Sequence, residues 1–337
     1  MKEEIDIAVV GATGSVGEAI LCMLEERDFP VGRIFPLASS RSAGKTVLYR
    51  GRVLEVGRLD EFDFSQAGLG LFSAGASVSA KYVPRAVAAG CLVVDNTSHF
   101  RNDPEIPLVV PEVNSHVLAQ HKGIIANPNC STIQLVVALK PIYDAVGISR
   151  INIATYQAVS GAGKRAIEEL AGQTGALLGG KNPAIEVLPK QIAFNVIPEI
   201  DTFQENGYTR EEMKIVWETR KILEDDRILI NPTAVRVPVF FGHSEAVHLE
   251  TSSPVTAQEV RELLDGAPGV SVIDERKPGG YPTPVTEAAR HDGVFVGRIR
   301  EDISCDHGID LWIVSDNIRK GAALNSIQIS EALFGLT

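Results

Sequence analysis

The sequence is poor in cysteine and has no closely spaced pair of thiols. Its 337 residues include four cysteines, at positions 22, 91, 130 and 305, and no CxxC pattern joins any two of them. Structural zinc sites and disulfide frameworks depend on short, regular cysteine spacings. We therefore expect no metal site and no disulfide framework, which is typical of a protein kept reduced in the cytoplasm.

Net positive charge and long apolar runs are missing as well. Acidic residues outnumber basic ones by 43 to 32, so the formal net charge is -11. This charge repels nucleic acid and anionic membrane surfaces, although a few local arginines can still hold an anionic small substrate. No segment approaches the length of about 18 apolar residues that a membrane span needs. Glu3, Glu4 and Asp6 stand where a secretory signal carries positive charge. We expect a cytoplasmic protein without nucleic-acid or membrane partners.

Short apolar runs alternate with helical patterns through the first 130 residues. A length of roughly 150 residues per domain predicts about two domains in this chain. We expect strands at 5–10, 34–38, 69–73, 92–94 and 124–126, and helices at 15–27 and 78–89. Apolar strands that alternate with helices indicate a parallel sheet covered by helices on both faces.

The pattern changes after about residue 150. Strands are expected at 151–156, 235–241, 247–251 and 311–314, separated by loops rich in glycine and proline. Alternation of polar and apolar residues in these strands favours an α+β domain with a mostly antiparallel sheet. The last twenty residues, from Ile318, are expected to form a helix that packs on the first domain. The predicted boundaries are 1–129 with 318–337, and 130–317.

A glycine-rich segment, VVGATGSVG, follows the first predicted strand and opens the first predicted helix. Gly11, Gly14 and Gly17 form a GxxGxxG pattern. Such glycines let the backbone approach a pyrophosphate closely, and a helix amino terminus favours its negative charge. A tight strand-to-helix turn with no ligand is the alternative. The position after the first strand favours a Rossmann-like dinucleotide site.

The loop after the second predicted strand suggests which dinucleotide is bound. Proteins that bind NAD usually place a carboxylate here for the ribose 2′-hydroxyl. This loop carries Ser39, Ser40, Arg41 and Ser42 and no carboxylate. A polar loop without a ligand would look similar, but hydroxyls and a guanidinium suit a 2′-phosphate. NADP is therefore favoured over NAD.

Cys130 lies in the segment ANPNCSTIQL, between a short apolar run and a predicted helix. A helix that begins near Ser131 would stabilise a thiolate at this position through its dipole and its free N–H groups. Most free cysteines are instead small buried residues. Cys22 and Cys91 fit that second interpretation because each lies in or beside an apolar run. The local sequence leaves both interpretations of Cys130 open.

His243 is the candidate proton carrier, and it follows Gly242 at the end of a predicted strand. A lone histidine is more often structural than catalytic. Arg236 lies seven residues earlier, and an odd spacing on a regular strand would place the two side chains on opposite faces. They share a site only if the chain turns or bulges near Pro238 or Gly242.

Motifs across the whole chain closely resemble those of bacterial aspartate-semialdehyde dehydrogenases. They occur in the family's order as GATGSVG, ASSRS, DNTSHFR, VVPEVN, ANPNCSTIQ, TYQAVSGAGK, EEMKIVWET, RVPVFFGHSEAV and DNIRKGAALN. The resemblance implies the reversible NADPH-dependent reduction of L-aspartyl-4-phosphate to aspartate semialdehyde through a cysteine thioester. It places the enzyme in lysine, methionine and threonine biosynthesis and implies a homodimer. The second domain would then serve catalysis and dimerisation.

The resemblance also implies a role for each matching residue. Cys130 resembles the nucleophile, His243 the acid/base catalyst and Gln157 the residue that orients the substrate. The implied substrate contacts are Arg101, Asn129, Glu211, Lys214 and Arg236, in which Arg236 takes the carboxylate, Glu211 the amine, and Arg101 with Lys214 the phosphate. The implied cofactor contacts are Gly11, Thr13, Gly14, Ser15, Val16, Ser39, Arg41, Ser42, Ser73, Ser160, Gly161 and Asn317.

Lys214 has an ordinary structural interpretation. Thr209 to Glu212 form a predicted capping box. One helix face then carries Glu211, Lys214, Glu218 and Lys221. A solvated, salt-bridged face would show the same spacing, so only the resemblance favours a phosphate site.

Two alternative functions stay open. N-acetylglutamyl-phosphate reductase and glyceraldehyde-phosphate dehydrogenase use the same chemistry of cysteine, histidine and nicotinamide. The pair of Arg236 and Glu211 favours a substrate with a free carboxylate and a free amine. A non-catalytic NADP-binding paralogue would be expected to lack the cysteine or the histidine, and both are present.

Overall fold

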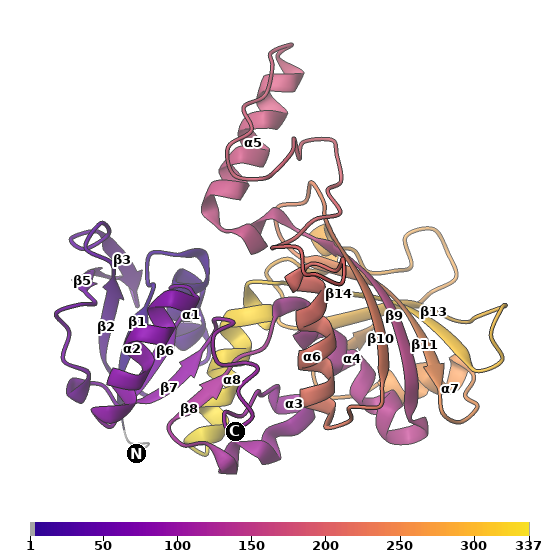
Figure 1. Cartoon of the computed structure of the whole chain (residues 1–337), viewed down its shortest axis with the longest axis horizontal. Coiled ribbons are helices and arrows are strands. Elements are labelled where there is room, and N and C mark those ends of the chain that lie inside the picture. The colour runs from indigo at the N-terminus through magenta and orange to yellow at the C-terminus, as the bar shows by residue number, and fades with distance from the viewer. Residues whose placement is uncertain (1–3, 337) are drawn as a thin grey trace. The chain divides into compact units, whose positions relative to one another are not determined.

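The computed structural model describes residues 4–336, so Glu3 of the acidic amino terminus lies outside the described residues. The chain forms two compact units (Figure 1). The first contains the residues up to Asn129 and those from Ala322 onward, and the second contains Cys130–Gly321. No helix within residues 4–336 combines the length and the apolar character needed to span a membrane.

The first unit is built on a six-stranded sheet in the order β5-β2-β1-β6-β7-β8. All five strand pairs are parallel, as the alternating pattern predicted. The strands are β1 (Ile5–Val10), β2 (Val31–Ala38), β5 (Gly57–Arg58), β6 (Leu69–Phe72), β7 (Leu92–Asp95) and β8 (Ile124–Ala126). A hairpin of β3 (Thr46–Tyr49) and β4 (Arg52–Glu55), absent from the predictions, lies outside this sheet.

Helices cover both faces of this sheet because its strands are apolar on both sides. Ile7 and Val9 of β1 pack in one core with α1 (Ser15–Glu26) and α8 (Leu324–Leu333). The alternate residues Ala8 and Val10 pack in a second core with α2 (Ala76–Ala88). The shorter helices are η1 (Phe64–Gln66), α3 (Pro111–Asn114) and η2 (Ser115–Gln120). The carboxyl-terminal helix therefore returns to the first unit.

The second unit contains a mixed sheet in the order β10-β9-β11-β14-β13-β12. Three of its pairs are antiparallel, while β10 with β9 and β12 with β13 are parallel. The strands are β9 (Ile148–Gln157), β10 (Leu229–Arg236), β11 (His243–Thr251), β12 (Val270–Val272), β13 (Val294–Glu301) and β14 (Gly308–Ser315). The expected fold class is confirmed.

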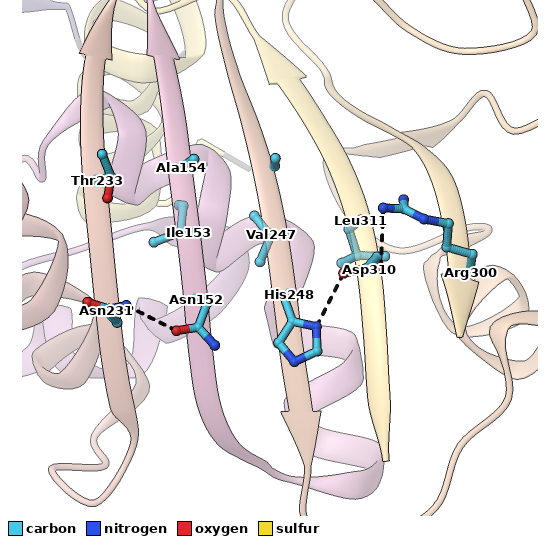
Figure 2. A pocket seen from close by; sticks show the side chains of 11 residues that line it. Asn152, Ile153, Ala154, Asn231, Thr233, Val247, His248, Arg300, Asp310 and Leu311 are labelled. Carbon is cyan, nitrogen blue, oxygen red and sulfur yellow. Dashed lines mark hydrogen bonds and ion pairs between the residues drawn. The ribbon is translucent and has the colours of Figure 1, made fainter. Parts of the chain in front are cut away.

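One face of this second sheet packs against α4 (Cys130–Val146), α6 (Arg210–Leu223) and α7 (Ala257–Leu264). Figure 2 shows side chains of β9, β10, β11, β13 and β14 that line a hollow of about 300 Å³ on this sheet. The remaining elements are η3 (Val159–Ala162), α5 (Lys164–Leu178), η4 (Pro284–Ala288) and η5 (Arg319–Ala323). Helix α5 packs with residues 192–197 in a small core of its own.

The strand expected at 235–241 is mostly wrong. Strand β10 ends at Arg236, and the chain then turns until β11 begins at His243. Pro238 has no N–H to continue a ladder, and Gly242 takes a left-handed φ of 89°. His243 therefore opens a strand instead of ending one.

Candidate active site

Cys130 is the first residue of α4, close to the position expected from the sequence. Residues 131–139 of this helix are buried, whereas Cys130 itself is partly exposed. The dipole at the amino end of a helix favours a negatively charged sulfur. Cys91 is a buried thiol, and burial raises its pKa to about 12. The prediction for Cys22 was wrong, because its exposed thiol donates to Glu26 at 3.0 Å.

Three predicted site residues lie at one edge of the second sheet. Gln157 ends β9, Arg236 ends the neighbouring β10 opposite it, and His243 begins β11 on the other side of β9. The turn at 237–242 brings Arg236 and His243 together around Gly161. An ideal Cβ on Gly161 would lie 3.0 Å from Nη1 of Arg236 and 3.4 Å from Nε2 of His243. The turn that the sequence required for a shared site is therefore present.

The hydrogen bond at Nδ1 fixes the tautomer of His243. The backbone N–H of Ala158 donates to Nδ1 at 3.1 Å, so the proton of the neutral ring lies on Nε2. Nε2 is buried and has no hydrogen-bond partner among the described residues. Burial, together with the positive charge of Arg236, lowers the pKa of His243 to about 3, and the negative charge of Glu211 opposes part of this change. The imidazole is neutral at physiological pH and presents one N–H donor.

Because its pKa is lowered in the folded chain, His243 should contribute a free energy of unfolding that decreases in acid. Unfolded histidine has a pKa of about 6.5, so between pH 6.5 and 3 the unfolded chain binds a proton that the folded chain does not. The contribution is complete above pH 6.5 and is lost as the pH falls. From pH 7 to pH 5 the parent should lose about 2 kcal/mol of unfolding free energy more than His243→Gln. Urea unfolding of both proteins at each pH measures this difference, and parallel pH profiles would contradict it.

Arg236 is a buried cation, and only one of its guanidinium N–H groups donates to the described residues. It is 6% exposed, and its Nη1 donates to the carbonyl of Ala158 at 2.9 Å. No other hydrogen bond joins its guanidinium to the described residues. Burial lowers the pKa of Arg236, and the negative charges of Glu211 and Cys130 oppose that change. The side chain is therefore held in place while its remaining N–H groups can take an anion.

Gln157 connects α4 to α6 through its amide. Its Nε2 donates to Oγ of Ser131 at 2.9 Å and to Oε1 of Glu211 at 3.2 Å. Oε2 of Glu211 lies 3.0 Å from Nζ of Lys214, which lies 2.7 Å from a carboxylate oxygen of Asp201. Burial alone would lower the pKa of Lys214, but the two carboxylates outweigh it, so the pKa lies above its ordinary value.

The predicted capping box of α6 is confirmed, but the solvated face is not. Thr209 and Glu212 exchange side-chain and backbone hydrogen bonds at the start of the helix. Glu211 is 6% exposed and Glu218 only 1%, so this face is buried. Buried carboxylates need partners, which explains why Lys214 contacts Glu211. The sequence pattern could not distinguish the two cases, because the i, i+3 spacing is the same in both.

Ser160 and Asn317 hold together the loops of the second unit. Their side chains exchange hydrogen bonds at 3.0 and 3.1 Å, and Oδ1 of Asn317 accepts the backbone N–H of Gly242 at 2.9 Å. Sequence reasoning missed a further residue nearby, Gly321. An ideal Cβ there would lie 2.8 Å from Cβ of Cys130. The only signal was its place in the DNIRKGAALN motif.

Substitution of Gly321 by alanine should displace the thiol of Cys130. The added methyl group has no room, because the Cα of Cys130 is also only 3.3 Å away. A shift of a few tenths of an ångström in a reacting atom should lower kcat roughly 10- to 100-fold. Steady-state kinetics measure the loss. Gly175→Ala is the matched control, since no atom lies within 4 Å of its ideal Cβ. Equal kcat in the two variants would contradict the close contact.

The first unit carries the glycine-rich turn between β1 and α1. An ideal Cβ on Gly17 would lie 2.2 Å from the carbonyl oxygen of Gly11, so only glycine lets the helix pack this closely. Gly11 has a φ of 91°, and Gly14 caps the helix. The turn lies at the carboxyl end of β1, where the strand order moves from β2 to β6. These features fit a pyrophosphate at the amino terminus of α1.

The other predicted cofactor residues of this unit follow the neighbouring strands. Ser39 follows β2, accepts the backbone N–H of Ser42 at 2.9 Å, and forms with it a turn that leaves Arg41 exposed. Ser73 follows β6 and donates to the carbonyl of Val10 at 3.1 Å. The carboxyl ends of β2, β1 and β6 meet at one edge of the sheet, so these residues flank the glycine turn. Thr13, Ser15 and Val16 lie in the turn and the first helical residues, all partly buried.

Arg101 and Asn129 belong to the first unit, unlike the other predicted substrate contacts. Both are buried, at 8% and 6% exposure. Nη2 of Arg101 donates to the backbone carbonyl of Asn96 at 2.7 Å, which anchors the guanidinium just after β7. Asn129 directly precedes Cys130 in the chain. Their roles toward a substrate stay predictions.

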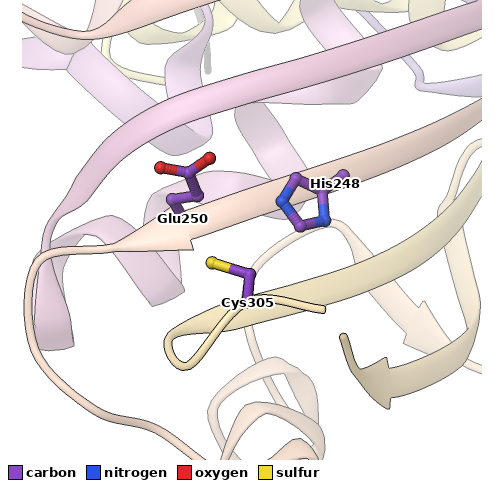
Figure 3. A group of neighbouring side chains, drawn as sticks. All are labelled: His248, Glu250 and Cys305. Atoms are coloured by element: carbon purple, nitrogen blue, oxygen red, sulfur yellow. The ribbon is translucent and has the colours of Figure 1, made fainter. Parts of the chain in front are cut away.

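One group of side chains in the described part of the chain has the composition of a metal site (Figure 3). One potential ligand atom from each of His248, Glu250 and Cys305 falls within 4.8 Å of the others. Nδ1 of His248 also lies 3.2 Å from a carboxylate oxygen of Asp302 and of Asp310, as Figure 2 shows for Asp310. All three side chains are partly exposed, and we assign the group no catalytic role. Cysteine spacing alone had given no indication of it.

Comparisons with known proteins agree with this architecture. The family described as semialdehyde dehydrogenase, NAD binding domain, matches residues 6–121, and semialdehyde dehydrogenase, dimerisation domain, matches residues 139–320. Aspartate-semialdehyde dehydrogenase from Legionella pneumophila is 63% identical over 335 residues, or 99% of this chain and 96% of that protein.

Solved structures show the same similarity. Aspartate semialdehyde dehydrogenase II from Vibrio cholerae, complexed with ASA, is 55% identical with a TM-score of 0.96 over 98% of each chain. The enzyme from Candida albicans, solved with NADP, is 27% identical with a TM-score of 0.77, again over 98% of each chain.

Proposed function

Because this chain belongs to the aspartate-semialdehyde dehydrogenase family, we propose which of its side chains perform each step of that reaction. The chain is an NADP-dependent oxidoreductase of amino-acid biosynthesis. It reduces L-aspartyl-4-phosphate to L-aspartate 4-semialdehyde and phosphate, and the reaction is reversible. We assign cofactor binding to the first unit, and catalysis and dimerisation to the second.

Cys130 is the nucleophile. Its thiolate attacks the acyl carbon, the C–O bond to phosphate breaks, and a thioester forms with release of inorganic phosphate. NADPH, when bound, supplies the hydride that reduces this thioester carbon. The resulting alkoxide then expels the thiolate, which returns Cys130 to its starting state and releases the aldehyde. The position of Cys130 at the amino end of α4 supports this role, because the helix dipole stabilises the thiolate each time it is released.

His243 donates a hydrogen bond to the reacting oxygen. Its Nε2–H has no hydrogen-bond partner within residues 4–336, and Nδ1 accepts the backbone N–H of Ala158. His243 thus takes the place of the acid/base catalyst, and as a neutral donor it stabilises the charge that develops on the oxygen through a hydrogen bond. The observation that carries the proposal is the convergence of this N–H and the free donors of Arg236 around Gly161.

Arg236 and Glu211 recognise the amino-acid end of the substrate. The guanidinium takes the α-carboxylate, and the Glu211 carboxylate, held by Gln157 and Lys214, takes the free amine. An N-acetylated substrate has no charged amine for Glu211, which disfavours the N-acetylglutamyl-phosphate reductase alternative. We assign the phosphate to Lys214 and Arg101, and Asn129 to substrate binding. Ser160, Gly161 and Asn317 complete the NADP contacts.

We also assign the chain to the cytoplasm as a homodimer. The match to a dimerisation domain and the open face of the second sheet support the dimer. Tyr156 on that face is 37% exposed and packs against Trp312. Light scattering tests this assignment, since the chain mass is 36.2 kDa and a dimer doubles it.

The activity is tested by following NADPH absorbance in the oxidative direction. Purified protein is mixed with aspartate semialdehyde and NADP, with and without phosphate. We expect NADPH formation that depends on phosphate, because the acyl group leaves Cys130 only when phosphate attacks it. N-acetylglutamate semialdehyde should give no more than a few percent of this rate. A faster rate with the acetylated compound would favour the alternative enzyme.

A further inference from the structure

Close to the catalytic residues, one carboxyl group is buried without a charged partner. Glu245 of β11 is completely buried, and neither of its carboxyl oxygens has a hydrogen-bond partner among the described residues. The amide of Gln134 on α4 is 1% exposed, and its oxygen and nitrogen also lack partners. Burial raises the pKa of Glu245 well above its ordinary value, and the nearby Gln134 amide opposes part of that rise. A carboxylate buried here without a cation would be costly, so the site favours the protonated form of Glu245.

Glu245 and Gln134 lie next to His243 and Cys130 along the same strand and the same helix. Glu245 is two residues beyond His243 on β11, so both point to the same face of the sheet. That face packs against α4, where Gln134 is four residues, or about one turn, beyond Cys130. The strand neighbours of Glu245 are Thr155 on β9 and Ile313 on β14, and neither carries a charge.

We propose that Glu245 and Gln134 are positioning residues, whose carboxyl and carboxamide groups hold the first turns of α4 against β11 and so set Cys130 relative to His243. The inference rests on the roles proposed above for those two residues. A protonated carboxyl can donate its O–H to the amide oxygen and accept the amide N–H on its carbonyl oxygen. Small rotations of the two terminal groups form both hydrogen bonds. Two leucines would fill the same space, but they would not fix the helix in one register.

The test compares an isostere with an apolar replacement of similar size. Glu245→Gln can still form two hydrogen bonds with Gln134, so its kcat should stay within threefold of the parent. Glu245→Leu and Gln134→Leu should each lower kcat at least 20-fold, with the KM for aspartate semialdehyde unchanged within twofold. The double leucine variant should lose no more than either single variant, because both changes remove one interaction. A role in stability alone would lower the melting temperature and leave kcat unchanged.

The matched control is Thr219→Val on α6. Thr219 is fully buried, and its hydroxyl has no hydrogen-bond partner in the described part of the chain. It lies on a different helix from Cys130, more than two turns beyond the start of α6. Its removal should leave kcat unchanged. If Glu245→Leu does not accumulate as folded protein, Gln134→Met answers the same question, since methionine fills the space of glutamine without hydrogen bonds.

Two results would overturn the positioning role. One is a parent-like kcat in Glu245→Leu or Gln134→Met, and the other is an equal loss in Glu245→Gln and Glu245→Leu. A separate assay of Cys130→Ser distinguishes a failure of the positioning role from a failure of the proposed function. If that variant keeps phosphate-dependent turnover, the role of Cys130 is wrong and the kinetic losses must have another cause.

Discussion

Replacement of Cys130 by serine should lower kcat on the order of ten-thousand-fold or more while the fold is retained. A serine hydroxyl is not ionised near neutral pH, and an ester is a poorer hydride acceptor than a thioester. The change replaces one sulfur by a smaller oxygen at a partly exposed residue that begins α4, so it should disturb the packing little. The assay is phosphate-dependent formation of NADPH, and circular dichroism reports the fold.

Cys22→Ser is the matched control for this prediction. Cys22 is an exposed thiol on α1 in the first unit, so its replacement should leave kcat unchanged. Residual turnover above about one percent in Cys130→Ser would contradict the nucleophilic role. Loss of the folded spectrum would instead assign a structural role to the thiol.

Arg236→Lys should lower kcat/KM roughly a thousandfold, which corresponds to about 4 kcal/mol. Lysine keeps the charge but loses the planar group that binds a carboxylate with two parallel hydrogen bonds. It also loses the bond from Nη1 to the carbonyl of Ala158, which fixes the guanidinium. Because the site is 6% exposed, solvent cannot compensate for the lost donors.

Arg150→Lys serves as the control on the same sheet. Its side chain is 46% exposed and lies 3.9 Å from Glu250, so the exchange should change kcat/KM less than twofold. A loss below tenfold in Arg236→Lys would show that charge alone is sufficient. The carboxylate site would then have to be sought elsewhere in the second unit.

Local patterns predicted much of the fold because they act over short distances. The apolar run Ile7–Val10 of β1 indicated a strand buried on both faces, and Ile7 and Ala8 do face separate cores. The glycine turn was predictable for a similar reason. Only glycine fits where Gly17 approaches the backbone of Gly11, so the spacing itself carries the signal.

Tertiary contacts determined what the sequence could not predict. The burial of Glu218 distinguishes a buried charge network from a solvated helix face, and no local spacing reports burial. The exposure of Cys22 and the contact of Gly321 with Cys130 also depend on residues distant in sequence. The end of β10 at Arg236 was missed because apolar residues continue to Phe241, although Pro238 interrupts the ladder.

In the oxidative direction, Cys130 should carry the acyl group as a thioester until phosphate attacks it. The protein is mixed with aspartate semialdehyde and NADP without phosphate, quenched in acid and digested, and its peptides are weighed by mass spectrometry. We predict one aspartyl adduct, on the peptide that contains Cys130, which disappears when phosphate is added before the quench. An adduct on another cysteine, or full turnover with no adduct on Cys130, would contradict the mechanism.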